Sequence, residues 1–184
     1  MTDVQLAGGW SGLTPLTEHD KYVFEKAFGG LAGIASEPHF VSRQVVNGMN
    51  YAFFCGASSA TNPPQTGFVI AEAHEATDGI VNRTNITTYG MMPQTLHSWL
   101  DAKPLDDHDI AVFEKATKGA TDVIHTPHLV SHQLANGKSY RYFCTSKSQT
   151  KMESTGKSII TINETAPEGE EVGDVRITNV ATFG

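Results

Sequence analysis

The chain has few cysteines, and this shortage limits the ways in which its fold can be stabilised. Only 2 of its 184 residues are cysteine, and Cys55 and Cys144 each lie in an apolar segment beside aromatic residues. The two positions are equivalent in an internal repeat, and a disulfide between equivalent core positions is geometrically awkward. We therefore expect two reduced thiols that pack as small buried hydrophobes, and no sign of an oxidising compartment.

Basic residues are also scarce, which bears on the choice of partner. The chain has 13 lysine and arginine residues against 20 acidic ones, a net charge of −7. Residues 1–90 hold 4 basic and 8 acidic residues, and residues 91–184 hold 9 and 12. Because neither half has a basic stripe or a basic cluster with interleaved aromatic residues, we predict no nucleic-acid partner.

Long apolar runs and catalytic motifs are missing as well. No apolar run approaches the length of a membrane span, so no membrane partner is predicted. The first residues have neither a basic start nor a long apolar stretch, so they do not form a signal peptide. As written, the sequence predicts a cytoplasmic protein; a secreted or periplasmic one would require that a signal had been removed. Without a nucleophile elbow, phosphate loop or paired-carboxylate motif, we predict no enzyme activity and no cofactor.

What the sequence does contain is a tandem repeat. A shift of 89 residues aligns residues 16–55 with residues 105–144 without a gap, and 19 of these 40 positions are identical. The same shift aligns Trp10 with Trp99. Such a repeat predicts two units of similar fold, which we place at residues 1–90 and 91–184, joined by a short link that contains Pro93.

Each repeat has the same predicted order of elements. A short strand and a turn at Thr14-Pro15 precede a helix whose N-cap is Thr17, with apolar residues at helical spacing after it. Alternating segments follow, with a hairpin at Asn47-Gly48, because both residues tolerate the positive φ of a tight turn. We therefore predict an α+β fold of two domains, each an antiparallel β-sheet wrapped around one α-helix.

Two stretches of the first repeat resemble the cystatin superfamily, especially its small, disulfide-free stefin branch. The sequence QVVNG at residues 44–48 is similar to the family's Gln-x-Val-x-Gly hairpin motif, and LAGG at residues 6–9 is similar to its Leu-x-Gly-Gly trunk. The resemblance implies cystatin-like domains and reversible, non-covalent inhibition of papain-like cysteine proteases. In that mode the trunk and two hairpin tips fill the active-site cleft beside the catalytic cysteine, and Gly48 allows a close approach.

The resemblance also implies which residues contact the protease. They are Leu6, Ala7, Gly8 and Gly9 of the trunk, Gln44, Val45, Val46, Asn47 and Gly48 of the first tip, and Asp78, Gly79 and Ile80 of the second tip. Secondary candidates in the second repeat are Gln133, Leu134, Ala135, Asn136 and Gly137. The second repeat is the poorer inhibitor, because Ala135 replaces the motif valine, His97-Ser98 replace the trunk glycines, and residues 168–171 make an acidic second tip.

Other interpretations remain open for the same residues. Gln44 and the Asn-Gly pair are also typical of an ordinary polar strand residue and a simple turn. A tandem cystatin fold can serve as a non-inhibitory interaction or scaffold module, or can inhibit zinc carboxypeptidases through the surface between its domains. Of His125, His128 and His132, only the last two share a strand face, and no carboxylate or cysteine completes a tetrahedral set, so no metal is predicted.

Overall fold

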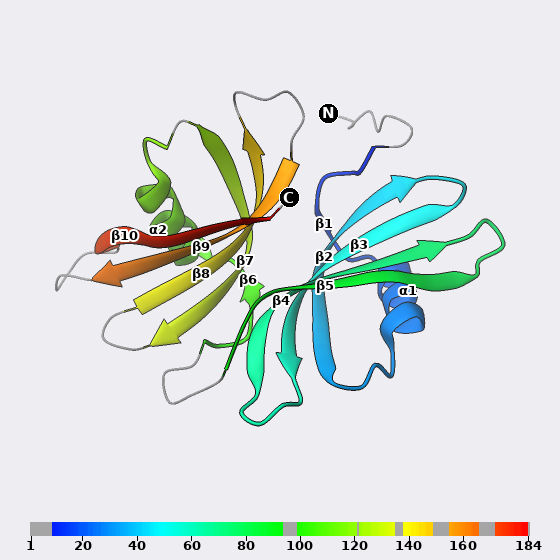
Figure 1. Ribbon diagram of the computed structural model, residues 1–184. Helices are drawn as coiled ribbons and strands as arrows, with labels where there is room; N and C mark the ends of the chain where they lie inside the picture. The colour runs from blue at the N-terminus through cyan, green and yellow to red at the C-terminus, as the bar shows by residue number, and fades with distance from the viewer. Residues whose placement is uncertain are drawn as a thin grey trace. The chain divides into compact units, whose positions relative to one another are not determined.

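The chain divides into two compact units, Met1–Met91 and Met92–Gly184. The computed structural model describes residues 9–93, 99–120, 122–134, 138–148, 155–165 and 172–183 (Figure 1). It contains two five-stranded antiparallel sheets, with strand orders β1-β2-β3-β4-β5 and β10-β9-β8-β7-β6. Strands that are consecutive in the sequence are therefore neighbours in each sheet, and alternate turns lie at the same end of a sheet.

The bounds of the elements are as follows. The first sheet and its helix comprise β1 (Thr14–Pro15), α1 (Glu18–Phe28), β2 (Ile34–Val45), β3 (Met49–Ser59), β4 (Gln65–Glu75) and β5 (Val81–Pro93). The second comprise β6 (Lys103–Pro104), α2 (Asp107–Thr117), β7 (Val123–Leu134), β8 (Lys138–Ser148), β9 (Thr155–Thr165) and β10 (Asp174–Phe183).

The α+β, cystatin-like fold class predicted from the sequence is wrong, because antiparallel sheet dominates the chain. Strands hold 62% of the described residues and helices hold 14%. The prediction gave the helices too much weight: each has 11 residues, about three turns, and buries only a narrow stripe. The last strand of the first sheet covers Val81–Pro93 and therefore includes Pro93, which was predicted to lie in the link between the repeats.

The start of α1 follows the sequence prediction. The Thr17 hydroxyl accepts a hydrogen bond from the Asp20 backbone N–H at 3.3 Å, and the Asp20 carboxylate accepts one from the Thr17 N–H at 2.7 Å. This reciprocal pair is a capping box, which satisfies two backbone donors that the helix leaves open. The N-cap at Thr17 is confirmed, and Asp106 with Asp109 forms the same box at α2.

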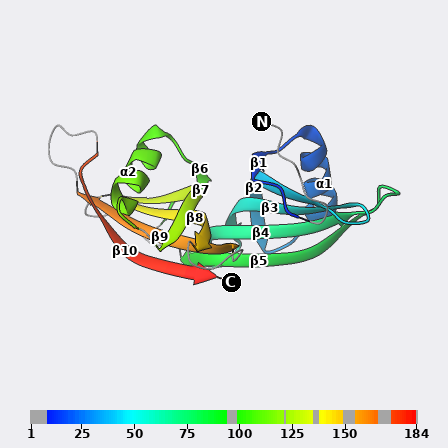
Figure 2. The same cartoon turned by 90° about the horizontal axis from the view of Figure 1, so that it is seen from above.

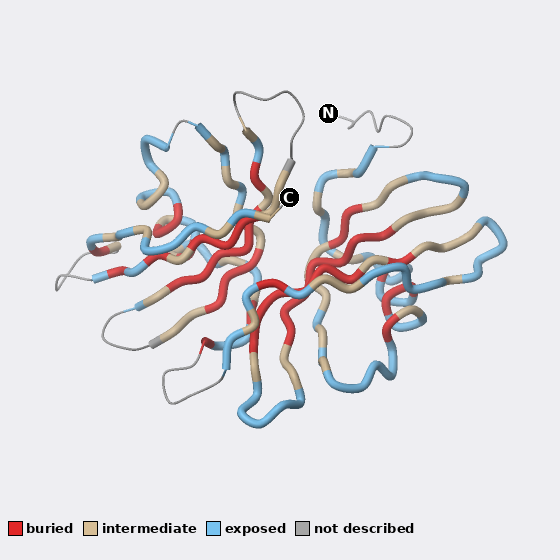
Figure 3. Tube along the Cα trace, in the orientation of Figure 1, coloured by how far each residue is buried: buried red, intermediate tan, exposed pale blue. Residues whose placement is uncertain are grey.

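The core of the first unit lies between α1 and one face of its sheet. Val23, Phe24 and Phe28 of the helix pack in one cluster with Phe53, whose ring centroid is 5.1 Å from that of Phe24. Figure 3 shows the buried segments along the middle of the long strands. Among the described residues no helix is long and apolar enough to cross a membrane.

Both cysteines lie inside these cores, as predicted. Cys55 and Cys144 are free thiols with no exposed surface. Burial raises the pKa of both thiols well above the ordinary range for cysteine, because the thiolate would lose its hydration there. Burial therefore disfavours the thiolate, which is the nucleophilic form of cysteine, in the folded protein.

The segment before α1 differs from the prediction. Thr14 and Pro15 form the edge strand β1, paired with Val41 and Phe40, and not a turn. Proline is accepted there because one side of an edge strand needs no backbone donor. A register shift at His39 of β2 marks a bulge in the strand that β1 joins.

Candidate functional site

Three segments that are distant in the sequence meet at one end of the first sheet. The β2–β3 and β4–β5 turns lie side by side there, as Figures 1 and 2 both show. The N-terminal segment reaches the same end, because Trp10 pairs with Gln44 in an isolated antiparallel bridge and the Ser11 N–H donates to the Arg43 carbonyl at 2.7 Å. Strand order thus brings both predicted tips to one end of the sheet, and the bridge of Trp10 to Gln44 brings the segment that begins at Gly9 there as well.

The first tip is a tight hairpin with two exposed valines. Asn47 and Gly48 have φ values of +43° and +121°, and the Val46 N–H donates to the Gly48 carbonyl at 3.2 Å. The predicted hairpin is confirmed. Val45 and Val46 are 51% and 44% exposed, so the tip presents apolar surface to solvent.

Gly48 is required by packing inside the molecule. A Cβ atom at this position would lie 2.3 Å from the Glu75 carbonyl oxygen and 3.2 Å from the Ala76 Cα. Only a residue without a side chain lets the first tip rest against the base of the second hairpin. Gly48 was expected to allow a close approach to a protease. In the structure it already makes a close approach to Glu75 within the first unit.

A chain of amide and imidazole groups joins the strands below the first tip. The Asn50 side-chain N–H donates to the Gln44 Oε1 at 3.0 Å, and the Asn50 Oδ1 lies 2.7 Å from the His74 Nδ1. These side chains belong to β3, β2 and β4, so they hold the tip in one conformation. The motif glutamine is therefore part of the support of the tip.

The second tip is a short turn that projects one apolar side chain. The Ala76 N–H donates to the Ile80 carbonyl at 2.9 Å, and the Ile80 N–H donates to the Asp78 Oδ1 at 3.1 Å. Gly79 has a φ of +83°, which favours glycine. Asp78 and Gly79 shape the turn, whereas Ile80 is 57% exposed.

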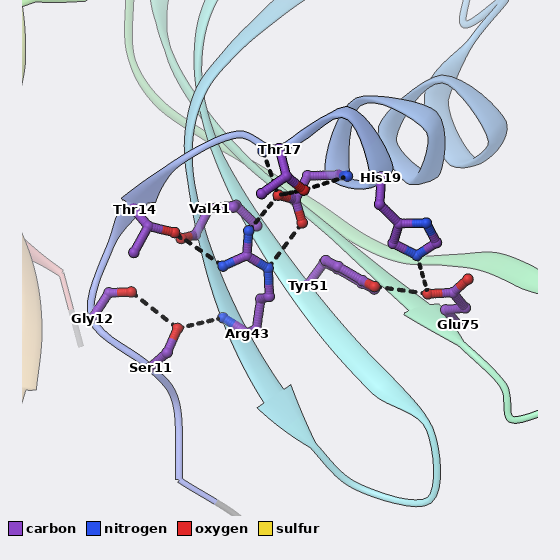
Figure 4. A network of polar contacts seen from close by, with 10 residues as sticks. Ser11, Gly12, Thr14, Thr17, His19, Val41, Arg43, Tyr51 and Glu75 are labelled. Atoms are coloured by element: carbon purple, nitrogen blue, oxygen red, sulfur yellow. Dashed lines mark hydrogen bonds and ion pairs between the residues drawn. The ribbon is translucent and has the colours of Figure 1, made fainter. Parts of the chain in front are cut away.

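A polar network ties the first turn of α1 to the base of the second tip (Figure 4). The Glu75 Oε2 accepts from the Tyr51 hydroxyl at 2.7 Å and lies 2.9 Å from the His19 Nε2. Burial opposes ionisation of Glu75, but the hydrogen bonds from His19 and Tyr51 outweigh it and lower the pKa of the carboxyl. Glu75 is therefore an anion held at the end of β4.

The same network contains a buried ion pair. Arg43 donates from Nε to the Asp20 Oδ1 at 2.9 Å and from Nη2 to the Asp20 Oδ2. Asp20 is only 1% exposed. Burial works against its charge, yet the hydrogen bonds from Arg43 and Thr17 prevail and lower the pKa of Asp20. This two-point geometry orients β2 against the helix.

The remaining predicted residues are placed less completely. Gly9 is exposed beside β2, whereas Leu6, Ala7 and Gly8 lie outside the described residues. In the second unit, Gln133 pairs with Ser139 and Leu134 ends β7. Ala135, Asn136 and Gly137, together with residues 168–171, lie outside the described part of the chain.

Two features of this end were missed in the sequence. One is the exposure of Trp10, which is 47% exposed while its repeat partner Trp99 is 8% exposed. The Glu75 network was not predicted, although a signal for it existed. His19, Tyr51 and Glu75 all recur at the 89-residue shift, as His108, Tyr140 and Glu164.

The histidines considered for a metal have separate partners. His125 lies 2.9 Å from the Ser158 hydroxyl, His128 lies 2.8 Å from the Thr145 hydroxyl, and His132 lies 2.7 Å from the Asp109 carboxylate. Within the described ranges, no three histidine, cysteine or acidic side chains are placed to hold an ion.

Comparison with protein-family models and with characterised proteins finds no match. Function is therefore inferred from the geometry of the tips.

Proposed function

We propose that the chain is a reversible, non-covalent inhibitor of papain-like cysteine proteases that inserts one end of its first unit into the active-site cleft. The observation that supports this proposal is a group of exposed apolar side chains at that end. They are Trp10, Val45, Val46 and Ile80, each between 44% and 57% exposed. Apolar side chains gathered on neighbouring exposed segments mark a surface for a protein partner.

The shape of this end favours a cleft over a flat partner. Two narrow turns project side by side, and the segment after the trunk runs along the first of them. The packing of Gly48 on Glu75 and the bonds of Asn50 hold the first turn in place before binding. A wedge that is already ordered loses little conformational entropy on association.

The class of target follows from the resemblance of the trunk and the first tip to the cystatin motifs. The trunk leads directly into Trp10, which pairs with Gln44, so its last residue stands beside the first tip. Val45 and Val46 present exposed apolar surface to the cleft of such a protease. Non-covalent inhibition fits a tip in which the chain reverses at Asn47-Gly48, because a cleaved peptide must lie extended across the catalytic cysteine.

The test is inhibition of a papain-like protease by the full chain and by Val46→Asp. The substitution places an unpaired charge in an apolar interface, so we expect an inhibition constant about 100-fold higher, as for a central contact residue. The matched control is Val180→Asp in β10, because Val180 is 46% exposed and far from the tips in sequence; it should leave inhibition unchanged.

Two results would contradict the proposal. One is the absence of inhibition by the unmodified chain at micromolar concentration. The other is equal inhibition by Val46→Asp and the unmodified chain. The first result would leave a non-inhibitory interaction module as the explanation of the exposed apolar end, and the second would show that inhibition does not depend on the first tip.

A further inference from the structure

The second unit contains a hollow that the proposed function does not use. Its volume is about 280 Å³, and it is lined mainly by Asp106, His108, Asp109, His132, Lys138 and Tyr140. This size is near the lower limit of small-molecule sites. The lining combines aromatic rings with acidic groups, so it is suited to a small polar ligand.

The internal repeat shows what the same place holds in the first unit. The residue equivalent to His132 is Arg43, whose guanidinium binds the buried Asp20 through Nε and Nη2 and donates from Nη1 to the Thr14 hydroxyl at 3.0 Å. Figure 4 shows this guanidinium beside Tyr51, which is equivalent to Tyr140. The fold therefore accommodates a guanidinium between a buried carboxylate and a tyrosine.

In the second unit this internal guanidinium is replaced by shorter groups. His132 Nε2 lies 2.7 Å from the Asp109 Oδ1, and its ring stands edge-on to Tyr140 with centroids 5.1 Å apart. Lys103 takes the place of Thr14, with its Nζ 2.8 Å from the Asp106 carboxylate and 3.3 Å from that of Asp109. Histidine is smaller than arginine, and the hollow lies beside it.

The charges around the hollow favour a cation. Asp106 and Asp109 line it, and Glu164 lies behind, 3.2 Å from the His108 Nε2. Lys138 is the basic residue of the lining and is exposed, while the Lys103 Nζ lies 2.8 Å from the Asp106 carboxylate. Two carboxylates and one ammonium group therefore line the hollow, so a positive ligand balances the charge.

We propose that this hollow binds a guanidinium group carried by an arginine. A guanidinium is planar, stacks on aromatic faces and donates two parallel hydrogen bonds to a carboxylate. His108, His132 and Tyr140 supply the rings, and Asp106 supplies a half-exposed carboxylate. The ligand would lie beside His132, the residue equivalent to Arg43, with Asp106 as its partner carboxylate.

The experiment titrates the full chain with Nα-acetyl-arginine amide and follows the ring signals of His108 and His132 by NMR. We expect saturable shifts with a dissociation constant on the order of 1 mM, and no saturation with Nα-acetyl-lysine amide. Free L-arginine is the third probe. Tighter binding of the capped form identifies an arginine within a polypeptide as the source, and tighter binding of the free form identifies a small molecule.

Two variants test the location of the site. Lys103→Thr with His132→Arg reproduces the first-unit pair and fills the hollow internally, so binding should weaken at least about tenfold. Asp106→Asn keeps a side chain that caps α2 but removes one carboxylate, so binding should weaken about fivefold, as expected for one partly exposed pair. Unchanged backbone spectra control for folding.

Three results would overturn the proposal. They are the absence of saturable shifts in the unmodified chain, equal binding of the arginine and lysine amides, and undiminished binding by a folded Asp106→Asn variant. The last result also decides the question if the double variant does not fold.

Discussion

At the scale of single residues, the two glycines of the tips illustrate different reasons for the same residue type. Gly48 has a positive φ and also lacks space for a Cβ, whereas Gly79 has a positive φ with nothing within 4 Å of its Cβ position. Conformational preference explains Gly79, while Gly48 also needs close packing between two hairpins. An alanine at each of the two positions should therefore change the free energy of unfolding by different amounts.

Gly48→Ala should destabilise the first unit more than Gly79→Ala does. The second substitution costs only the left-handed backbone, about 1 kcal/mol, whereas the first adds a contact of 2.3 Å with the Glu75 carbonyl. We expect Gly48→Ala to lower the free energy of unfolding by about 3 kcal/mol, measured by urea denaturation. Equal losses in the two variants would contradict the packing of the first tip on the second.

The cysteines give a second test at this scale. Cys55 and Cys144 are buried, and burial raises the pKa of both thiols. A thiol reagent should therefore label the native protein only as fast as it opens or unfolds, and both thiols should react at once in denaturant. Rapid labelling of either cysteine under native conditions would show that its surroundings are not those described.

At the scale of elements, the helix and the second hairpin are joined by ionised side chains. Glu75 bonds Tyr51 and His19, and Asp20 bonds Arg43. The pKa of each carboxyl is lowered in the folded state because these donors outweigh the cost of burial. These contacts should therefore weaken as the pH falls and the two carboxyl groups become protonated.

The stability of the first unit should fall as the solution is acidified. A carboxyl whose pKa is lowered by folding stabilises the protein above its unfolded pKa, and this contribution is lost as pH falls through the folded pKa. For Glu75 and Asp20 this loss begins as the pH falls to about 4 to 5, because the pKa of such carboxyl groups in an unfolded chain is about 4. Urea denaturation between pH 7 and pH 3 measures it.

The control for this pH effect is Glu75→Gln. The variant keeps the shape of the side chain but has no carboxyl to protonate, so its free energy of unfolding should change less over the acidic range. An identical pH dependence in Glu75→Gln and the unmodified chain would mean that this carboxylate does not contribute.

At the scale of the whole molecule, the two units differ although they arose from one repeat. Trp10 is half exposed beside the first tip, whereas Trp99 is buried with the Arg141 guanidinium 4.9 Å from its ring centroid. Arg43 in the first unit corresponds to His132 in the second. The first unit thus presents the apolar end, and the second unit holds the polar hollow.

This difference predicts that one chain inhibits one protease molecule. The first unit carries the exposed tryptophan and the valine pair, while the second has Ala135 in place of Val46 and a buried Trp99. Titration of an active-site-counted protease with the full chain should reach complete inhibition at a ratio of 1:1. A ratio of two protease molecules per chain would show that the second unit binds equally well.

The sequence by itself determined the features that depend on neighbouring residues. The N-cap at Thr17, the hairpin at Asn47-Gly48 and the apolar setting of the cysteines were all predicted correctly, because local conformational preference and hydrophobic pattern decide them. The fold class was predicted wrongly, since strand length depends on pairing with neighbours along the sheet, and pairing partners are not visible in a pattern.

Only the tertiary structure decided how the site is supported. Glu75 is 24 residues from Tyr51 and 56 from His19, and Asp20 is 23 from Arg43. No local rule joins residues at such separations. Burial brings them together, and a buried carboxylate must then find donors within reach or remain unpaired at a cost in free energy. For that reason the exposed tips follow from sequence motifs, while the groups that hold them follow from packing.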